Sequence, residues 1–251
     1  MFIFTRLRCF QVVLYTIVLG RVMPNKRGEK LVRILCFGDS LTLGLTSSGS
    51  HPYLIKLQEY LNNYRWTNGT MEPQSGNRHI ELHNAGVAGE KVQDMLWRMR
   101  SILQRAVGKY NWVIILGGTN DLISMQSIWA PWKKFQDELT IFNGIIQLHN
   151  EAERFGAKTV AMTIPALKCE KREDGNAEIP SMKEVRTKVN ERIRQFVANS
   201  SGKVFLADVD RKMQISRDEM LCSDGVHLTA SAYDKIANVI YNVLKGLVPN
   251  K

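Results

Sequence analysis

Short apolar runs rich in β-branched residues alternate with longer segments of helical periodicity from residue 31 onward. The apolar runs predict five strands, at residues 31–37, 80–83, 112–116, 159–164 and 204–207. In the segments between them, apolar residues recur every three or four positions, which predicts helices near 52–63, 90–107, 133–155, 182–198 and 229–246. Because this alternation is typical of βαβ units, we expect a three-layer α/β/α sandwich around a five-stranded, mostly parallel sheet.

The length of 251 residues suits one α/β domain around a single core. Hydrophobic residues make up 44% of the chain and charged residues 23%, which is close to ordinary globular usage, so we expect little disorder. Residues 64–78 and 168–181 are rich in turn-forming residues and are expected to be long loops.

The N-terminal segment carries most of the positive charge. Residues 1–33 hold seven basic residues and one acidic residue, so +6 of the formal net charge of +10 lies there. No basic stripe with interleaved aromatic residues follows, and we therefore expect no nucleic-acid partner.

Arg6 and Arg8 precede an apolar run from Cys9 to Leu19, in the order of a secretory signal peptide or signal anchor. We therefore divide the chain into a leader, residues 1–29, and a folded domain, residues 30–251. The leader favours the secretory pathway over the cytoplasm, and we expect membrane contact only through it. The alternative is an upstream extension, with Met23 as the true start.

Three predicted strands run directly into polar or glycine-rich blocks at their carboxyl ends, where open parallel sheets bind ligands. These blocks are Gly38-Asp39-Ser40-Leu41, Asn84-Ala85-Gly86-Val87-Ala88-Gly89 and Gly117-Gly118-Thr119-Asn120-Asp121. A fourth block, Asp224-Gly225-Val226-His227, precedes the last predicted helix. We expect the four blocks to meet at one edge of the sheet.

Acyl transfer on a serine requires a base within hydrogen-bond reach and a third group that orients the base. Ser40, His227 and Asp224 supply these groups, and Asp224 can reach the imidazole of His227 within one short loop. Asp208 and Asp210 also follow a strand and are alternative acids. The structural alternative for Ser40 is a helix N-cap.

The negative charge that develops on the carbonyl oxygen requires preorganised donors. The backbone N–H of Ser40, the backbone N–H of a glycine in the second block and the side-chain amide of Asn120 are available. Asp39 and Asp121 are expected to be structural, as are His51, His79, His83 and His149.

The blocks GDSL, NAGVAG, GGTND and DGVH resemble, in order and spacing, the signature of the SGNH hydrolases, also called GDSL esterases and lipases. The resemblance covers residues 31–246. It implies a flavodoxin-like three-layer sandwich and a hydrolase that needs no metal or organic cofactor. The cysteines also lack metal-binding spacing, although a disulfide between Cys169 and Cys222 stays open.

Site roles follow from the same resemblance. It implies Ser40 as nucleophile and first oxyanion donor, Asn120 as third donor, and Asp224 and His227 as acid and base. The remaining donor is a glycine, and Gly89 matches by its distance along the chain from Asn84, with Gly86 as the competing choice.

The resemblance implies a serine esterase that acts on a small-molecule ester. The segment Pro52-Tyr53-Leu54 and the chain length resemble small isoamyl-acetate-type or acetyl esterases, so we expect short-chain acyl or acetyl esters. The alternatives are an acyltransferase using the same acyl-enzyme, a lysophospholipase-like lipid esterase and a binding module without turnover. The oligomeric state stays open. Apolar residues that follow the third block are candidates for the acyl pocket: Leu122, Ile123, Met125, Ile128, Trp129 and Trp132.

Overall fold

The computed structural model describes residues 31–67, 70–73, 80–124, 138–168, 181–213, 220–245 and 247. The predicted leader lies outside these residues, so the division at residue 29 stays a prediction. Among the helices that are described, none combines the length and the apolar character that crossing a membrane requires.

Five parallel strands form the central sheet, in the order β6-β1-β7-β8-β9. They are β1 (Val32–Gly38), β6 (Ile80–Gly86), β7 (Trp112–Leu116), β8 (Lys158–Met162) and β9 (Val204–Ala207). This is the 2-1-3-4-5 order of flavodoxin-like sheets. The predicted fold class is therefore confirmed.

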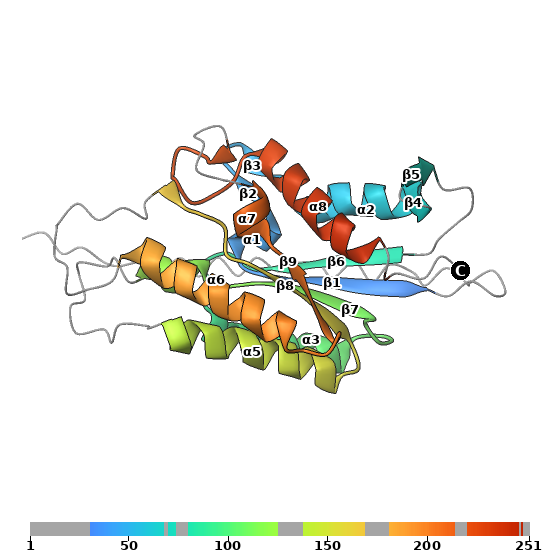
Figure 1. Cartoon of the computed structure of the whole chain (residues 1–251), viewed down its shortest axis with the longest axis horizontal. Coiled ribbons are helices and arrows are strands. Elements are labelled where there is room, and N and C mark those ends of the chain that lie inside the picture. The colour runs from blue at the N-terminus through green and yellow to red at the C-terminus, as the bar shows by residue number, and fades with distance from the viewer. Residues whose placement is uncertain are drawn as a thin grey trace, which may run out of the picture.

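Helices cover both faces of the sheet (Figure 1). On one face lie α2 (Tyr53–Asn63), α7 (Val209–Met213) and α8 (Ala230–Leu244). On the other lie α3 (Val92–Arg105), α5 (Glu138–Arg154) and α6 (Met182–Ala198). The short helices α1 (Ser40–Leu43) and α4 (Thr119–Ser124) directly follow the ends of β1 and β7.

Strand β1 contributes side chains to the apolar core on each face of the sheet. Ile34 and Cys36 belong to the apolar cluster under α2 and α8, whereas Leu35 and Phe37 belong to the cluster under α3, α5 and α6. Successive side chains of a strand point to opposite faces, so a strand with helices on both sides is mostly apolar.

Residues 64–73 differ from the predicted loop. The strands β4 (Tyr64–Thr67) and β5 (Thr70–Pro73) pair antiparallel as a hairpin. Aromatic and β-branched residues flank the turn-forming pair Asn68-Gly69, and this combination favours a hairpin over a plain loop. A second small hairpin, β2 (Leu45–Thr46) and β3 (Gly49–Ser50), follows α1. Most of the other predicted loop, residues 169–180, lies outside the described residues.

Candidate active site

Ser40 is the first residue of α1, directly beyond the carboxyl end of β1. Asp39 is the N-cap, and its Oδ1 accepts a hydrogen bond of 2.9 Å from the backbone N–H of Leu41. The N-cap alternative for Ser40 is therefore wrong, and the structural role expected of Asp39 is confirmed. Ser40 is 4% exposed, so its side chain is almost fully buried at the start of α1.

A chain of hydrogen bonds joins Ser40, His227 and Asp224. His227 Nε2 lies 3.0 Å from Ser40 Oγ, and His227 Nδ1 lies 2.6 Å from Asp224 Oδ2. With the proton on Nδ1, the imidazole donates to the carboxylate and its Nε2 accepts from the serine hydroxyl. This is the arrangement in which an imidazole can remove a proton from a serine.

The loop that carries Asp224 and His227 is fixed by its own backbone. Asp224 Oδ1 accepts from the backbone N–H groups of Val226 and His227, each at 2.9 Å. Gly225 between them has a φ of 70°, which a glycine adopts without strain. Cys222 N–H donates to His227 O at 2.7 Å, which closes the loop. The imidazole orientation is thus set locally, as the short spacing predicts.

Opposing effects act on the carboxyl group of Asp224. Partial burial alone raises its pKa, but the hydrogen bonds from His227 and from two backbone N–H groups outweigh burial and hold the pKa below its ordinary value of 3.8. Asp224 therefore stays ionised at neutral pH, where it can stabilise an imidazolium.

The alternative acids Asp208 and Asp210 belong to a different cluster. Arg194 donates to Asp208 Oδ1 at 2.8 Å and to Asp210 Oδ2 at 2.9 Å, and Arg186 also pairs with Asp210. Although burial raises the pKa of both carboxyl groups, these arginine contacts lower it further than burial raises it. Of the three acids, the structure brings only Asp224 to His227.

The two glycines of the second block have different surroundings. Gly86 ends β6, and its N–H donates to Asn84 Oδ1 at 2.9 Å. A Cβ on Gly86 would lie 2.1 Å from the backbone nitrogen of Leu43, so glycine is required there for packing against α1. A Cβ on Gly89 would meet nothing within 4 Å. Gly89 is exposed, and no acceptor for its N–H lies within the described parts of the chain.

Asn120 lies in the first turn of α4, at the carboxyl end of β7. Its Nδ2 donates to the backbone carbonyl of Glu90, next to Gly89, at 3.0 Å. The amide carries two N–H groups, so one remains for a ligand. The third block is thereby tied to the second.

Asp39 and Asp121 are buried carboxyl groups close to Ser40 at the edge of the sheet. Burial raises the pKa of Asp39 to about 7, although the hydrogen bond from Leu41 lowers it, and the nearby charge of Asp121 raises it further. Burial also raises the pKa of Asp121, whose Oδ2 accepts from Val92 N–H at 3.2 Å. Asp121 is thus structural, as expected, and it anchors the start of α3.

Three of the four remaining histidines have polar partners away from Ser40. His51 pairs with Asp234, His83 with Tyr110, and buried His149 with Thr159. These contacts agree with the structural roles that we expected, and His79 lies outside the described residues. Burial lowers the pKa of His149 to about 3, so its ring is neutral in the fold.

Only part of the candidate acyl pocket is described. Leu122 is fully buried in the core, and Ile123 is partly buried and packs against the same apolar cluster. Met125, Ile128, Trp129 and Trp132 lie outside the described residues. Cys222 is a buried free thiol that donates to Leu228 O, and Cys169 lies outside the described residues.

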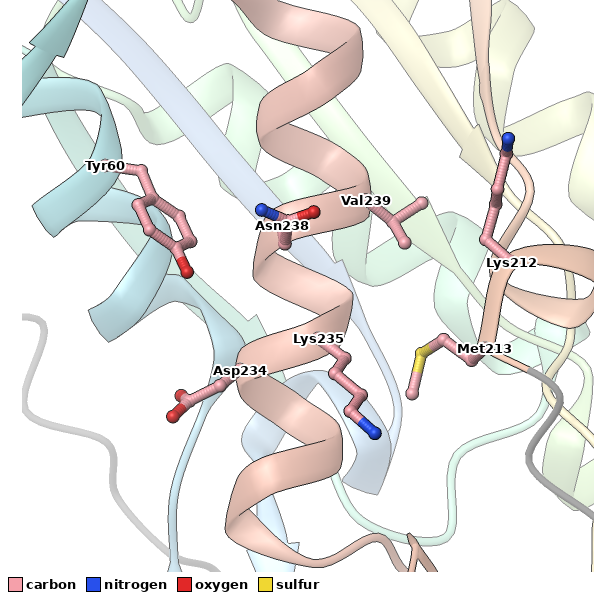
Figure 2. Close-up of a pocket in the computed structure, with 7 residues that line it drawn as sticks. All are labelled: Tyr60, Lys212, Met213, Asp234, Lys235, Asn238 and Val239. Carbon is pink, nitrogen blue, oxygen red and sulfur yellow. The ribbon is translucent and has the colours of Figure 1, made fainter. Parts of the chain in front are cut away.

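A surface hollow lies apart from Ser40, around the middle of α8 (Figure 2). Tyr60 of α2 lines it on one side of α8 and Met213 of α7 on the other. None of its lining residues is a predicted site residue. Across the part of the chain that is described, no three His, Cys, Asp or Glu side chains are placed to hold a metal ion.

Two residues that no motif singled out, Glu90 and Arg98, border the predicted site. Their side chains form an ion pair beside Gly89 and Asn120. The sequence carries no signal for this pair beyond a polar position on an amphipathic helix. Two of the three partners of Arg98 are backbone carbonyls, which no sequence pattern reveals.

Comparisons with known proteins identify the family of the chain. Residues 34–240 match the family described as GDSL-like Lipase/Acylhydrolase. The chain matches no curated protein sequence.

Solved structures share the fold at low sequence identity. A member of the lipolytic protein G-D-S-L family from Veillonella parvula is 17% identical, with a TM-score of 0.64, and the match covers 86% of this chain and 100% of that one. A lipase/acylhydrolase from Enterococcus faecalis is 20% identical, with a TM-score of 0.62 and coverage of 88% and 99%. A catalytic mutant of an acetylxylan esterase from Geobacillus stearothermophilus is 14% identical, with a TM-score of 0.62 and coverage of 86% and 95%.

Proposed function

Because the chain belongs to the GDSL-like lipase/acylhydrolase family and is thus an ester hydrolase, we propose that it cleaves short-chain acyl or acetyl esters through an acyl-enzyme on Ser40. The observation that carries this proposal is the hydrogen-bonded chain from Ser40 Oγ through His227 to Asp224. A buried serine next to an oriented imidazole has the means to become a nucleophile at neutral pH.

In the first step, Ser40 Oγ attacks the ester carbonyl while its proton passes to His227 Nε2. Asp224 holds the Nδ1–H of the imidazole and stabilises the positive charge that the ring acquires. The tetrahedral intermediate then collapses, and His227 returns the proton to the leaving alcohol. The products of this step are the acyl-enzyme and the free alcohol.

Three donors are proposed for the oxyanion of that intermediate: the backbone N–H of Ser40, the backbone N–H of Gly89 and the Nδ2–H of Asn120. The choice of Gly89 over Gly86 is supported by the Gly86 N–H being used by Asn84. The contact between Asn120 and Glu90 supports a common site, because it holds the side-chain donor beside the loop that contains Gly89.

In the second step, His227 takes a proton from water as the water oxygen attacks the acyl carbonyl. The resulting tetrahedral intermediate collapses, His227 returns the proton to Ser40 Oγ, and the acid is released. An acyltransferase would differ only in using an alcohol in place of water. The preference for short acyl groups is supported by the likeness to an acetylxylan esterase.

Hydrolysis of nitrophenyl acetate, butyrate and octanoate tests the proposal. We expect the acetate or butyrate to be the best substrate and Ser40→Ala to lower kcat by about 10⁴-fold or more. Ser48→Ala, a change of the same kind at an exposed turn, should leave kcat unchanged. Equal rates for Ser40→Ala and wild type would overturn the mechanism, and preferential formation of a new ester with added alcohol would identify a transferase.

A further inference from the structure

Arg98 connects the segments that carry the proposed site residues. It lies on α3, and its side chain is 15% exposed. Its Nε donates to Glu90 Oε1 at 2.8 Å and to Oε2 at 2.9 Å, and Nη2 also donates to Oε2. The remaining donors reach the backbone: Nη1 donates to Ala85 O at 2.9 Å, and Nη2 donates to Gly38 O at 3.1 Å.

Each of these partners lies next to a residue with a proposed role. Gly38 ends β1, two residues before Ser40. Ala85 lies near the end of β6, and Glu90 follows Gly89 directly. One guanidinium therefore holds the ends of two neighbouring strands and the loop that follows the second strand.

The contacts of Arg98 with Glu90, Ala85 and Gly38, which we call the clamp, are among those that hold the loop that follows β6, residues 87–91. Within it, Val87 N–H donates to the same Gly38 O at 3.0 Å, and the Glu90 carbonyl accepts from Asn120. A shift of Glu90 would therefore move Gly89 and Asn120 together relative to Ser40.

Arginine suits this place for a geometric reason. Its planar guanidinium presents five donors in a fixed fork, whereas a lysine presents a compact charge without that fork. The Arg98 guanidinium also lies over the ring of Phe37, 4.1 Å from its centroid, which fixes the plane. Glu90 is only 10% exposed, so the ion pair is largely shielded from water.

We infer that Arg98 is a positioning residue for ester hydrolysis, which holds the Gly89 and Asn120 donors in register with Ser40. This inference rests on the proposed function, since it concerns the same oxyanion. Arg98 touches no reacting atom and acts through Glu90 and the backbone. Oxyanion donors act over a narrow range of distance, and a misplacement of about 1 Å can cost about 10²-fold in rate.

Arg98→Lys tests the inference, and Arg100→Lys is the matched control. The lysine keeps a charge opposite Glu90, so we expect the fold to be retained, but the lysine cannot reach all three acceptors. Arg100 lies on the same helix and also forms an ion pair with a buried glutamate, Glu151, at 2.8 Å, but on the side that faces α5.

We expect Arg98→Lys to lower kcat for nitrophenyl acetate by about 10- to 100-fold with KM within about 3-fold of wild type. A boronic acid that forms a tetrahedral adduct with Ser40 should lose affinity by the same factor as kcat. Arg100→Lys should match wild type in kcat and in boronate affinity. A merely structural role would lower the melting temperature without this selective loss in kcat and in boronate affinity.

The outcomes separate this inference from the proposed function. If Ser40→Ala abolishes hydrolysis but Arg98→Lys and Arg100→Lys have equal kcat and boronate affinity, only the positioning role of Arg98 is overturned. If Ser40→Ala retains activity, the proposed function fails. Should Arg98→Lys not fold, Glu90→Gln takes its place, because it weakens the same clamp from the other side and keeps the shape of the side chain. An unchanged kcat in Glu90→Gln would then overturn the inference.

Discussion

His227 Nε2 lies 3.0 Å from Ser40 Oγ, although 187 positions separate the two residues in the chain. The sheet brings them together, because β1 delivers Ser40 to its carboxyl edge and the loop before α8 returns to that edge. Local hydrogen bonds to Asp224 then orient the imidazole. The topology of the sheet thus brings the two residues close together, and the four-residue loop from Asp224 to His227 orients the imidazole.

Replacing Asp224 tests the orientation of His227. In Asp224→Asn, the Oδ1 can still accept from Val226 and His227, but an amide N–H now faces Nδ1 and favours the wrong tautomer. We expect kcat to fall by about 10³- to 10⁴-fold with little change in melting temperature. The control is Asp208→Asn, which should keep kcat and lower the melting temperature by weakening the contact with Arg194. The opposite pattern would identify Asp208 as the acid.

Replacing Asn120 tests the side-chain donor. We expect Asn120→Ala to lower kcat by about 10²- to 10³-fold while KM changes little, because the lost hydrogen bond forms mainly in the transition state. Steady-state kinetics on nitrophenyl acetate would measure both. Asn242→Ala, on the exposed side of α8, should behave as wild type. A rise in KM at constant kcat would contradict the oxyanion role.

The two glycines of the second block should respond differently to alanine. Gly86→Ala would place a Cβ 2.1 Å from Leu43 N, so we expect severe loss of folding, seen by circular dichroism. Gly89→Ala meets no atom but sits at a φ of 77°, so about 1–2 kcal/mol of stability should be lost. It should also lower kcat, because the added Cβ narrows the approach to the N–H. A folded Gly86→Ala with wild-type stability would contradict the packing that we describe.

The buried carboxyl group of Asp39 predicts a pH dependence of stability. Burial raises its pKa to about 7 from 3.8, so between these values the folded chain binds more protons than the unfolded chain. The free energy of unfolding therefore falls as pH rises from about 4 to about 7, by about 4 kcal/mol for this group. Asp39→Asn removes this titration and keeps an acceptor for Leu41 N–H.

Thermal melts of Asp39→Asn and wild type would measure the effect. The variant should gain stability relative to wild type as the pH is raised from about 4 to about 8. Asp94→Asn, at an exposed position of α3, should show no such trend. Parallel curves for Asp39→Asn and wild type would contradict the raised pKa.

Much of the fold could be predicted because the periodicity of strands and the periodicity of helices are both visible in short stretches of sequence. Strand periodicity and helix periodicity placed β7 and α6 at their observed bounds. Strand β6 runs to Gly86, beyond the predicted end at residue 83, because Asn84 and Ala85 pair with β1 despite their polar or small side chains. The hairpin at Tyr64–Pro73 was missed because turn-forming residues alone do not distinguish a loop from a hairpin.

The polar blocks also predicted which residues meet at one edge of the sheet, because the carboxyl ends of parallel strands converge there. Excluding Asp208 as the acid required the tertiary structure, which pairs its carboxylate with Arg194 and places Asp224 against His227. Arg98 could not be predicted for a related reason. Two of its partners are backbone carbonyls, which have no residue identity that a sequence pattern could reveal.

Ester hydrolysis by this chain requires that Ser40 be a nucleophile that His227 activates. Covalent modification with a fluorophosphonate, followed by mass spectrometry of the digested protein, measures this directly. We predict a single adduct on the peptide that contains Ser40, forming at least about 10³-fold more slowly in His227→Gln. An adduct on another residue, or an equal rate of modification in His227→Gln, would contradict the account.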